Sequence, residues 1–191
     1  MGMDVSGDPE NTNYNYLGVV LGTAEGIVNL SRNIGSFPEH MSKIKDDRIR
    51  NEIRYKMKFD HKTTVAFCIK LDRKRIIEDI IQRRKIRKKR GRIKAVYDTY
   101  NWVLMRMLQE RIEYFVLSHN VSFTELGVQC DNDCAPFVKA ASLKRENIGA
   151  AYRISDYVAW FNNADETPDH VFDLNFVDEM ESRIYKILKI D

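Results

Sequence analysis

The sequence has few residues that could cross-link a small fold and no segment that could anchor it in a membrane. Its 191 residues include three cysteines and four prolines. An odd cysteine count cannot form a complete disulfide framework, and it favours a reducing compartment. No apolar run approaches the roughly 20 residues of a membrane-spanning helix, and the N-terminus has acids where a signal peptide would be basic and then apolar. These absences predict a cytoplasmic protein without a membrane association.

The motifs of several enzyme classes are also missing. No P-loop and no Gly-x-Gly-x-x-Gly turn follows an expected strand, which argues against a kinase or a dehydrogenase. The four histidines form no His-x-x-x-His pair, so a zinc hydrolase is not expected. No Gly-x-Ser-x-Gly elbow occurs. Cys130 and Cys134 lie four residues apart, but no histidine is near them in sequence, and we interpret both as structural thiols.

One block of positive charge stands out against an otherwise acidic chain. The formal net charge is +3, yet the segment 83–94, RRKIRKKRGRIK, holds nine basic residues and no acid, so the rest of the chain carries −6. Such asymmetry is typical of proteins that bind the phosphates of nucleic acid. The alternative interpretation is a solvated helix end. The candidate nucleic-acid-binding residues are Arg83, Arg84, Arg87, Lys88, Lys89, Arg90 and Arg92.

Hydrophobic patterning predicts a mixed α/β chain with no repeat or linker, and therefore one domain over residues 1–191. With 43% hydrophobic residues, the chain can form a real core. Strands are expected at 2–5, 16–22, 63–71 and 125–131, the first two forming a β-hairpin. Helices are expected at 24–33, 42–54, from a cap at Asp72 to a break at Gly91, 93–118, from a cap at Asp133 to 141, 149–162 and 176–189. The region near 72–94 is interpreted as a helical, basic insertion.

Three aspartates occupy positions where a carboxylate needs a partner. Asp4 follows the first core residue of the N-terminal strand, Asp131 ends a later strand, and Asp156 is the lone acid in AAYRISDYVAW. Hard divalent cations prefer oxygen ligands, so three converging carboxylates would hold Mg²⁺ or Mn²⁺. Asp133 is the substitute ligand if Asp131 only shapes a turn.

Each acid also has a purely structural interpretation. Asp4 would bond the amides of the hairpin turn that follows it. Asp131 would be a turn residue, and Asp156 would form a surface pair with Arg153. The aromatic residues at 152–160 are expected to belong to the core rather than to a base-stacking surface.

The order of these features resembles the ribonuclease H-like superfamily. The opening D-V-S-G-D is similar to the D-x-S-G-D starts of uncharacterised prokaryotic families of that superfamily, and I-S-D-Y-V-A resembles their late A-D-x-x-A helix. The resemblance implies a mixed, roughly five-stranded sheet flanked by helices, with helical insertions. It also implies two-metal cleavage of phosphodiester bonds, with Asp4 bridging the ions and Asp131 and Asp156 as outer ligands.

The superfamily site has a fourth acid on its first long helix. Asp98, in the first turn of the 93–118 helix, has about the expected place in the sequence. Glu110, at the edge of the apolar face of that helix, is the alternative.

We therefore expect a Mg²⁺- or Mn²⁺-dependent nuclease that acts on RNA or DNA. One alternative is a non-catalytic nucleic-acid-binding module on the same fold, in which the basic segment does the binding. Another is a protein-interaction module whose acids only cap turns. The sequence is compatible with a homodimer.

Replacing Arg87, Lys88, Lys89 and Arg90 by glutamine will weaken binding to oligonucleotides of every sequence, because these side chains would bind phosphates and not bases. The slope of log K against log salt concentration should fall by about 0.7–0.9 for each phosphate that is no longer neutralised. Fluorescence anisotropy over a salt series measures both quantities. Equal affinity of the variant and the wild-type chain at low salt would exclude this segment from nucleic-acid binding.

Overall fold

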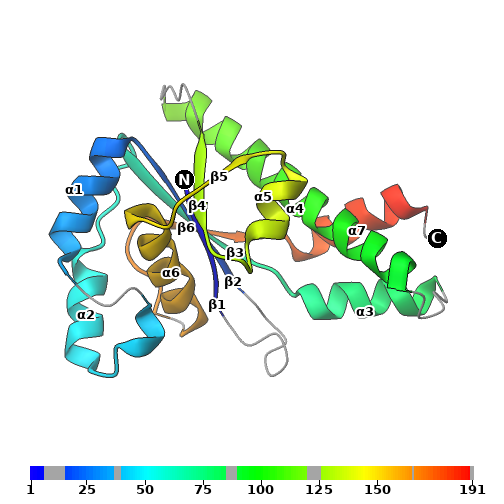
Figure 1. The fold of residues 1–191 in the computed structure, drawn as a ribbon, viewed down its shortest axis with the longest axis horizontal. Helices are drawn as coiled ribbons and strands as arrows, with labels where there is room; N and C mark the ends of the chain where they lie inside the picture. The colour runs from blue at the N-terminus through cyan, green and yellow to red at the C-terminus, as the bar shows by residue number, and fades with distance from the viewer. Residues whose placement is uncertain (7–15, 37–39, 85–89, 120–125, 165, 190–191) are drawn as a thin grey trace.

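A six-stranded mixed sheet with helices on both faces forms the protein (Figure 1). The computed structural model describes residues 1–6, 16–36, 40–84, 90–119, 126–164 and 166–189, with only the backbone of Arg90 and His119. The strands are β1 (Gly2–Ser6), β2 (Tyr16–Gly22), β3 (Thr64–Lys70), β4 (Gly127–Cys130), β5 (Lys144–Glu146) and β6 (Val171–Asn175).

The strand order is β5-β4-β1-β2-β3-β6, and five of these strands run in the same direction. β2 is antiparallel to both β1 and β3, whereas β4 is parallel to β1, β5 to β4, and β6 to β3. The carboxyl ends of β1 and β4 therefore lie side by side. In open α/β sheets this edge is the usual place for a ligand.

The helices divide into two layers (Figure 1). The first layer, packed on one face, contains α1 (Ala24–Ile34), α2 (Asp47–Lys56) and α6 (Ala150–Asn163). The second layer contains α3 (Arg73–Arg83), α4 (Arg90–His119), α5 (Ala135–Ala140) and α7 (Val177–Leu188). None of these described helices combines the length and apolar character needed to cross a membrane.

β3 is a continuous apolar run whose side chains pack against both helical layers, as is typical of a central strand. Phe67 and Ile69 face the second layer, and Ala66 and Cys68 face the first. On α4 the apolar residues at three- and four-residue steps are buried: Val96, Tyr100, Val103, Leu104, Met107, Leu108 and Phe115. The Tyr100 hydroxyl donates a 2.8 Å hydrogen bond to the carbonyl of Leu71, which follows β3.

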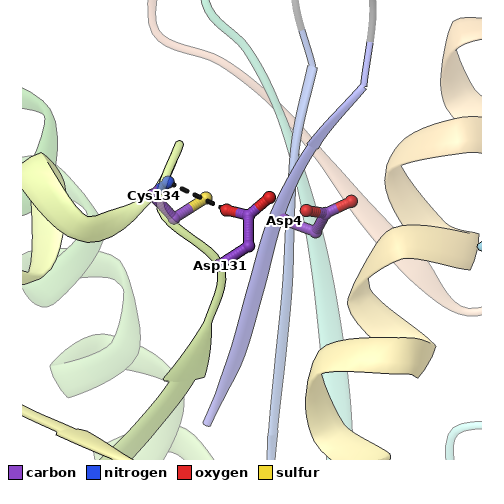
Figure 2. A group of neighbouring side chains, drawn as sticks. All are labelled: Asp4, Asp131 and Cys134. Atoms are coloured by element: carbon purple, nitrogen blue, oxygen red, sulfur yellow. Dashed lines mark hydrogen bonds between the residues drawn. The ribbon is translucent and has the colours of Figure 1, made fainter. Parts of the chain in front are cut away.

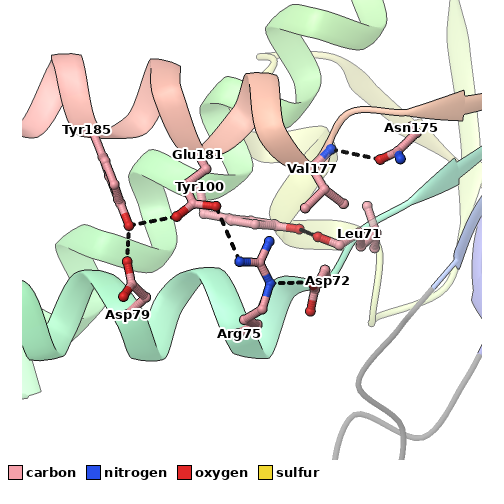
Figure 3. Close-up of polar contacts among 9 residues, drawn as sticks. All are labelled: Leu71, Asp72, Arg75, Asp79, Tyr100, Asn175, Val177, Glu181 and Tyr185. Atoms are coloured by element: carbon pink, nitrogen blue, oxygen red, sulfur yellow. Dashed lines mark hydrogen bonds and ion pairs between the residues drawn. The ribbon is translucent and has the colours of Figure 1, made fainter.

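A polar network joins α3 to α7 on the second layer (Figure 3). The Arg75 guanidinium pairs with Asp72 at 2.5 Å and with Glu181 at 3.4 Å. The Tyr185 hydroxyl hydrogen-bonds with the carboxylates of Asp79 and Glu181. These ion pairs and hydrogen bonds hold the two helices together.

Two expected helix boundaries are wrong. The helix after β3 ends at Arg83, and Gly91 lies inside α4 instead of breaking it. One glycine in a helix costs about 1 kcal/mol of stability relative to alanine. The stabilisation from packing along a 30-residue helix is larger than this cost, so the helix continues through Gly91. Asp72 is the N-cap residue, as expected, but it adopts a left-handed conformation and its side chain makes no capping bond, because its carboxylate pairs with Arg75.

The two outermost strands were not expected from the sequence. β5 has three residues, all exposed, and β6 lacks a clear alternation of buried and exposed residues. Both are edge strands that exist through pairing with β4 and β3. The sheet consequently has six strands, and the expected 42–54 helix is a short 3-10 turn at Met41–Lys43 followed by α2.

α6 lies unusually close to β1 and β2, because glycines face it. A Cβ on Gly18 would lie 2.2 Å from the carbonyl oxygen of Ser155, and one on Gly2 would lie 1.9 Å from that of Ala151. Gly18 is paired with Asp4 across the β1–β2 ladder. The close approach therefore sets the residue after Ser155, which is Asp156, over β1.

Gly18→Ala will destabilise the protein, because the added methyl group forces α6 away from the sheet. We expect a loss of about 1–3 kcal/mol in the free energy of unfolding, as for other overpacked cores, measured by urea denaturation. Gly91→Ala is the matched control: a Cβ there meets nothing within 4 Å, so this change should stabilise the protein by up to about 1 kcal/mol. Equal effects of the two substitutions would show that α6 does not need the glycine.

Candidate active site

Two aspartates and a cysteine meet where the carboxyl ends of β1 and β4 lie together (Figure 2). Asp4 is on β1 and is 5% exposed, Asp131 directly follows β4, and Cys134 precedes α5. One ligand atom of each lies within 4.8 Å of the other two. Asp131 and Cys134 belong to one turn, whereas Asp4 comes from a distant part of the sequence.

Asp131 both shapes its turn and reaches the site. Its Oδ1 accepts hydrogen bonds from the backbone amides of Asp133 (2.9 Å) and Cys134 (3.1 Å). Figure 2 shows its other oxygen on the side of Asp4. Asp131 can therefore be a turn residue and a candidate metal ligand at the same time, the two interpretations that the sequence left open.

Asp156 approaches the same point from α6. It is 8% exposed, and a hydrogen bond joins its carboxyl group to that of Asp4. Its Oδ2 accepts a 2.6 Å hydrogen bond from the Met41 amide, and its Oδ1 lies 3.9 Å from His40 Nδ1. The amide and the histidine thus orient the Asp156 carboxyl group.

The pKa values of the two buried carboxyl groups are both raised. Burial, then the hydrogen bond and charge of Asp156, then the charge of Asp131, raise the pKa of Asp4 to about 9. Burial also raises the pKa of Asp156, although the Met41 amide, Asp4 and His40 act in the opposite direction. Two adjacent carboxylates in a low-dielectric site cannot both ionise without a compensating cation. A divalent cation would supply that compensation and displace the proton.

Two further groups at the site carry no charge. Burial raises the pKa of Tyr152 above its ordinary value, and the hydrogen bond that its hydroxyl donates to Asp4 adds to this effect. Burial likewise raises the pKa of the Cys134 thiol, and the charges of Asp4 and Asp131 raise it further. The site thus combines three carboxyl groups with a phenol and a thiol.

The structure does not bring the other candidate acids into this cluster. Asp133 is exposed, and the position before α5 that it was expected to hold belongs to Cys134. Asp98 is exposed on α4, which packs on the opposite face of the sheet from α6. Glu110 is bound through both oxygens by Arg183, at 3.1 and 2.9 Å, and this pairing lowers the pKa of Glu110. Neither candidate on the first long helix therefore supplies a carboxylate to Asp4.

The basic segment is described only at its ends. Arg83 pairs with Asp79 at 2.9 Å and lies over the ring of Tyr185, while Arg84 and Arg92 are exposed. Three further predicted residues, Arg87, Lys88 and Lys89, lie outside the described part of the chain, and the Arg90 side chain does too.

Sequence reasoning missed three residues that complete the site, Cys134, Tyr152 and His40. The signal for Cys134 is the Asp131-x-x-Cys134 spacing, which places the thiol in the turn shaped by Asp131. Tyr152 is one helical turn before Asp156, and such a spacing puts both side chains on the same face of α6. His40 has no local signal, because it reaches Asp156 only through the fold.

Comparison of the chain with protein-family models, with curated proteins and with solved structures gives no match.

Asp4→Asn will make the metal-free protein more stable at pH 8, by on the order of a few kcal/mol. A carboxyl group whose pKa is raised on folding contributes stability that is complete below its unfolded pKa, near 4, and is lost as the pH rises toward about 9. Asparagine cannot ionise, so the variant avoids this loss. Urea unfolding with EDTA at pH 5 and pH 8 measures the difference.

Asp133→Asn is the control, since Asp133 is exposed and its change should shift stability equally at both pH values. If the free energy of unfolding of the wild-type protein changes no more between pH 5 and pH 8 than that of Asp4→Asn, the pKa of Asp4 is not raised in the folded protein.

Proposed function

We propose that this chain is a divalent-metal-dependent nuclease that hydrolyses phosphodiester bonds by a ribonuclease H-like, two-metal mechanism. The observation that carries the proposal is the position of Asp4, which clusters with Asp131 and Cys134 on one side and interacts with the buried Asp156 of α6 on the other. The carboxyl groups of Asp4 and Asp156 are buried together, and a cation there would neutralise both. The proposal includes nucleic acid as the partner and the cytoplasm as the location, which agrees with buried, free cysteines.

The chain order of the elements supports this assignment. Apart from the added helices α1, α2 and α3, a hairpin with an early Asp is followed by a third strand, a long helix, a strand with Asp directly after it and a late helix with Asp. The two strands that bring Asp4 and Asp131 together are neighbours and parallel. β6 is an addition to the roughly five strands that the resemblance implies.

In this proposal Asp4 is the central ligand, because it lies between Asp131 and Asp156. Backbone amides orient the two outer carboxylates: those of residues 133 and 134 hold Asp131, and that of Met41 holds Asp156. These carboxylates would hold divalent cations, and the chemistry that such cations would supply is activation of a water molecule and stabilisation of the leaving oxygen. Carboxylate oxygens suit both Mg²⁺ and Mn²⁺, so either ion would fit this set of acids.

A second function is favoured by one specific observation. Neither Asp98 nor Glu110 reaches the cluster, so the described part of the chain supplies one carboxylate fewer than the superfamily pattern. That deficit favours a non-catalytic nucleic-acid-binding module on the same fold, in which the acids at most hold one structural cation.

Asp4→Asn and Asp156→Asn will each abolish Mn²⁺-dependent cleavage. Loss of a residue that only supports a metal ligand already lowers activity 10–100-fold, so loss of a ligand should lower it by more than about 100-fold. The assay measures cleavage of labelled single- and double-stranded RNA and DNA, with Mn²⁺ or Mg²⁺. Anomalous scattering from Mn²⁺-soaked crystals locates the ions.

Asp98→Asn and Glu110→Gln are matched controls, since they remove acids of the same kind from outside the cluster. Both variants should bind Mn²⁺ as the wild type does. If manganese is bound without any cleavage of the four substrates, the non-catalytic module is correct; if no manganese is bound at Asp4, the nuclease proposal fails.

A further inference from the structure

A second candidate site lies in the other helical layer, between α4 and α5. An open cavity of about 960 Å³ is formed there, and its lining includes Asn132, the residue that follows Asp131. Cavities of about 300–1,000 Å³ are the usual size for small-molecule and cofactor sites. The turn that carries Asp131 is therefore shared between the candidate active site and this cavity.

The polar group that points to a ligand is the side chain of Asn101. Asn101 lines the cavity and is only 4% exposed, and its Oδ1 accepts no hydrogen bond from any described residue. A buried acceptor without a hydrogen-bond donor destabilises the folded protein. The final torsion of an asparagine side chain has broad minima, so the amide can turn to meet a donor that enters the cavity.

The adjacent residue supplies an aromatic surface. Trp102 lines the same cavity, yet half of its surface is exposed. Pro136 and Ile187 also contribute apolar surface to the lining. An exposed tryptophan beside a buried amide suits a flat, polar-edged ring, because any nucleobase can stack on the indole face.

The charges around the cavity favour an anion. Lys94 and Lys139 line it and are both exposed, and they outnumber the single carboxylate of Asp98 in that lining. Lys94 is also the last residue of the basic segment 83–94. A ring-binding surface next to two lysines matches a base and its phosphate.

We propose that this cavity binds one nucleotide of a nucleic-acid strand whose backbone continues to the carboxylate cluster. The base stacks on Trp102 and donates a ring N–H or exocyclic amine hydrogen to the Asn101 carbonyl, and Lys94 and Lys139 bind the phosphate. This inference rests on the proposed function for its choice of ligand. The same chemistry would also suit a free mononucleotide, so the experiment tests both sources.

The test uses tryptophan fluorescence in EDTA, where no cleavage takes place. Trp160→Phe leaves Trp102 as the only tryptophan. Three probes are titrated: an eight-nucleotide oligoadenylate, the same strand with all bases removed, and adenosine 5′-monophosphate. The oligoadenylate should quench the fluorescence of Trp102, and the abasic strand should bind without quenching it.

Three substitutions identify the groups that bind the nucleotide. Trp102→Ala should weaken oligoadenylate binding about 5- to 150-fold, the range for loss of one stacked base, and Trp102→Phe should restore part of it. Asn101→Leu should lower affinity for the oligoadenylate while it raises the melting temperature, because it removes an unsatisfied buried acceptor. Substitution of a residue with a structural role alone would lower the affinity and the melting temperature together.

The outcomes separate the cavity from the nuclease. Oligoadenylate affinity that is unchanged in Trp102→Ala, or quenching by neither base-containing probe, overturns the nucleotide site whether or not Asp4 is needed for cleavage. Quenching by the monophosphate alone keeps a nucleotide site but assigns it to a free nucleotide, and so overturns its link to a strand. Quenching by the oligoadenylate without any Mn²⁺-dependent cleavage supports the cavity and rejects the nuclease.

Discussion

The contact between the carboxyl groups of Asp4 and Asp156 is the feature on which the candidate site depends. Two acids that are only 5% and 8% exposed can lie together only if a proton or a cation neutralises one charge. Backbone packing brings the two groups together, because Gly2 and Gly18 allow the backbone of α6 to contact β1 and β2 directly. The sheet and the helix thus enforce an electrostatic arrangement that a stable core would otherwise avoid, which is typical of sites that bind a ligand.

The turn after β4 connects this contact to the rest of the molecule. Asp131 uses one oxygen to organise the backbone before α5 and keeps the other on the side of Asp4. The same turn places Cys134 against the cluster and Asn132 at the cavity beside α4. A single tight turn therefore controls the geometry of both candidate sites.

The two helical layers differ in what they contribute. The layer with α6 provides the buried acid and the groups that orient it, namely the Met41 amide and His40. The layer with α4 provides apolar packing on its inner face and an open cavity on its outer side. Glu110 serves that second layer as an ion pair with Arg183, which ties α4 to α7 and removes the acid from any role at Asp4.

What the sequence by itself determined is local. The sequence has an apolar run in β3, an alternation in β4 and a periodic apolar face in α4, and the burial of each element in the structure agrees with its pattern. The same reasoning singled out the three aspartates, because a carboxylate inside an apolar segment needs a partner wherever the segment lies. It also predicted the α/β class, although not the strands at the edges of the sheet: β5 and β6 are polar or irregular, and they form through pairing with neighbours.

Only the tertiary structure decided which side chains meet. Asp98 was a candidate partner of Asp4 by its place in the sequence and Glu110 by its position at the edge of the apolar face of its helix, but α4 packs on the face of the sheet opposite α6. Conversely, His40 reaches Asp156 from a segment in which the sequence shows no helical or strand periodicity. The side-chain Oδ1 of Asn101 is without a hydrogen-bond donor because of how the neighbouring elements pack around it. Sequence periodicity predicts the direction of a side chain relative to its own helix or strand. Which helices and strands lie next to one another, and therefore which side chains meet at the site, is determined by long-range packing.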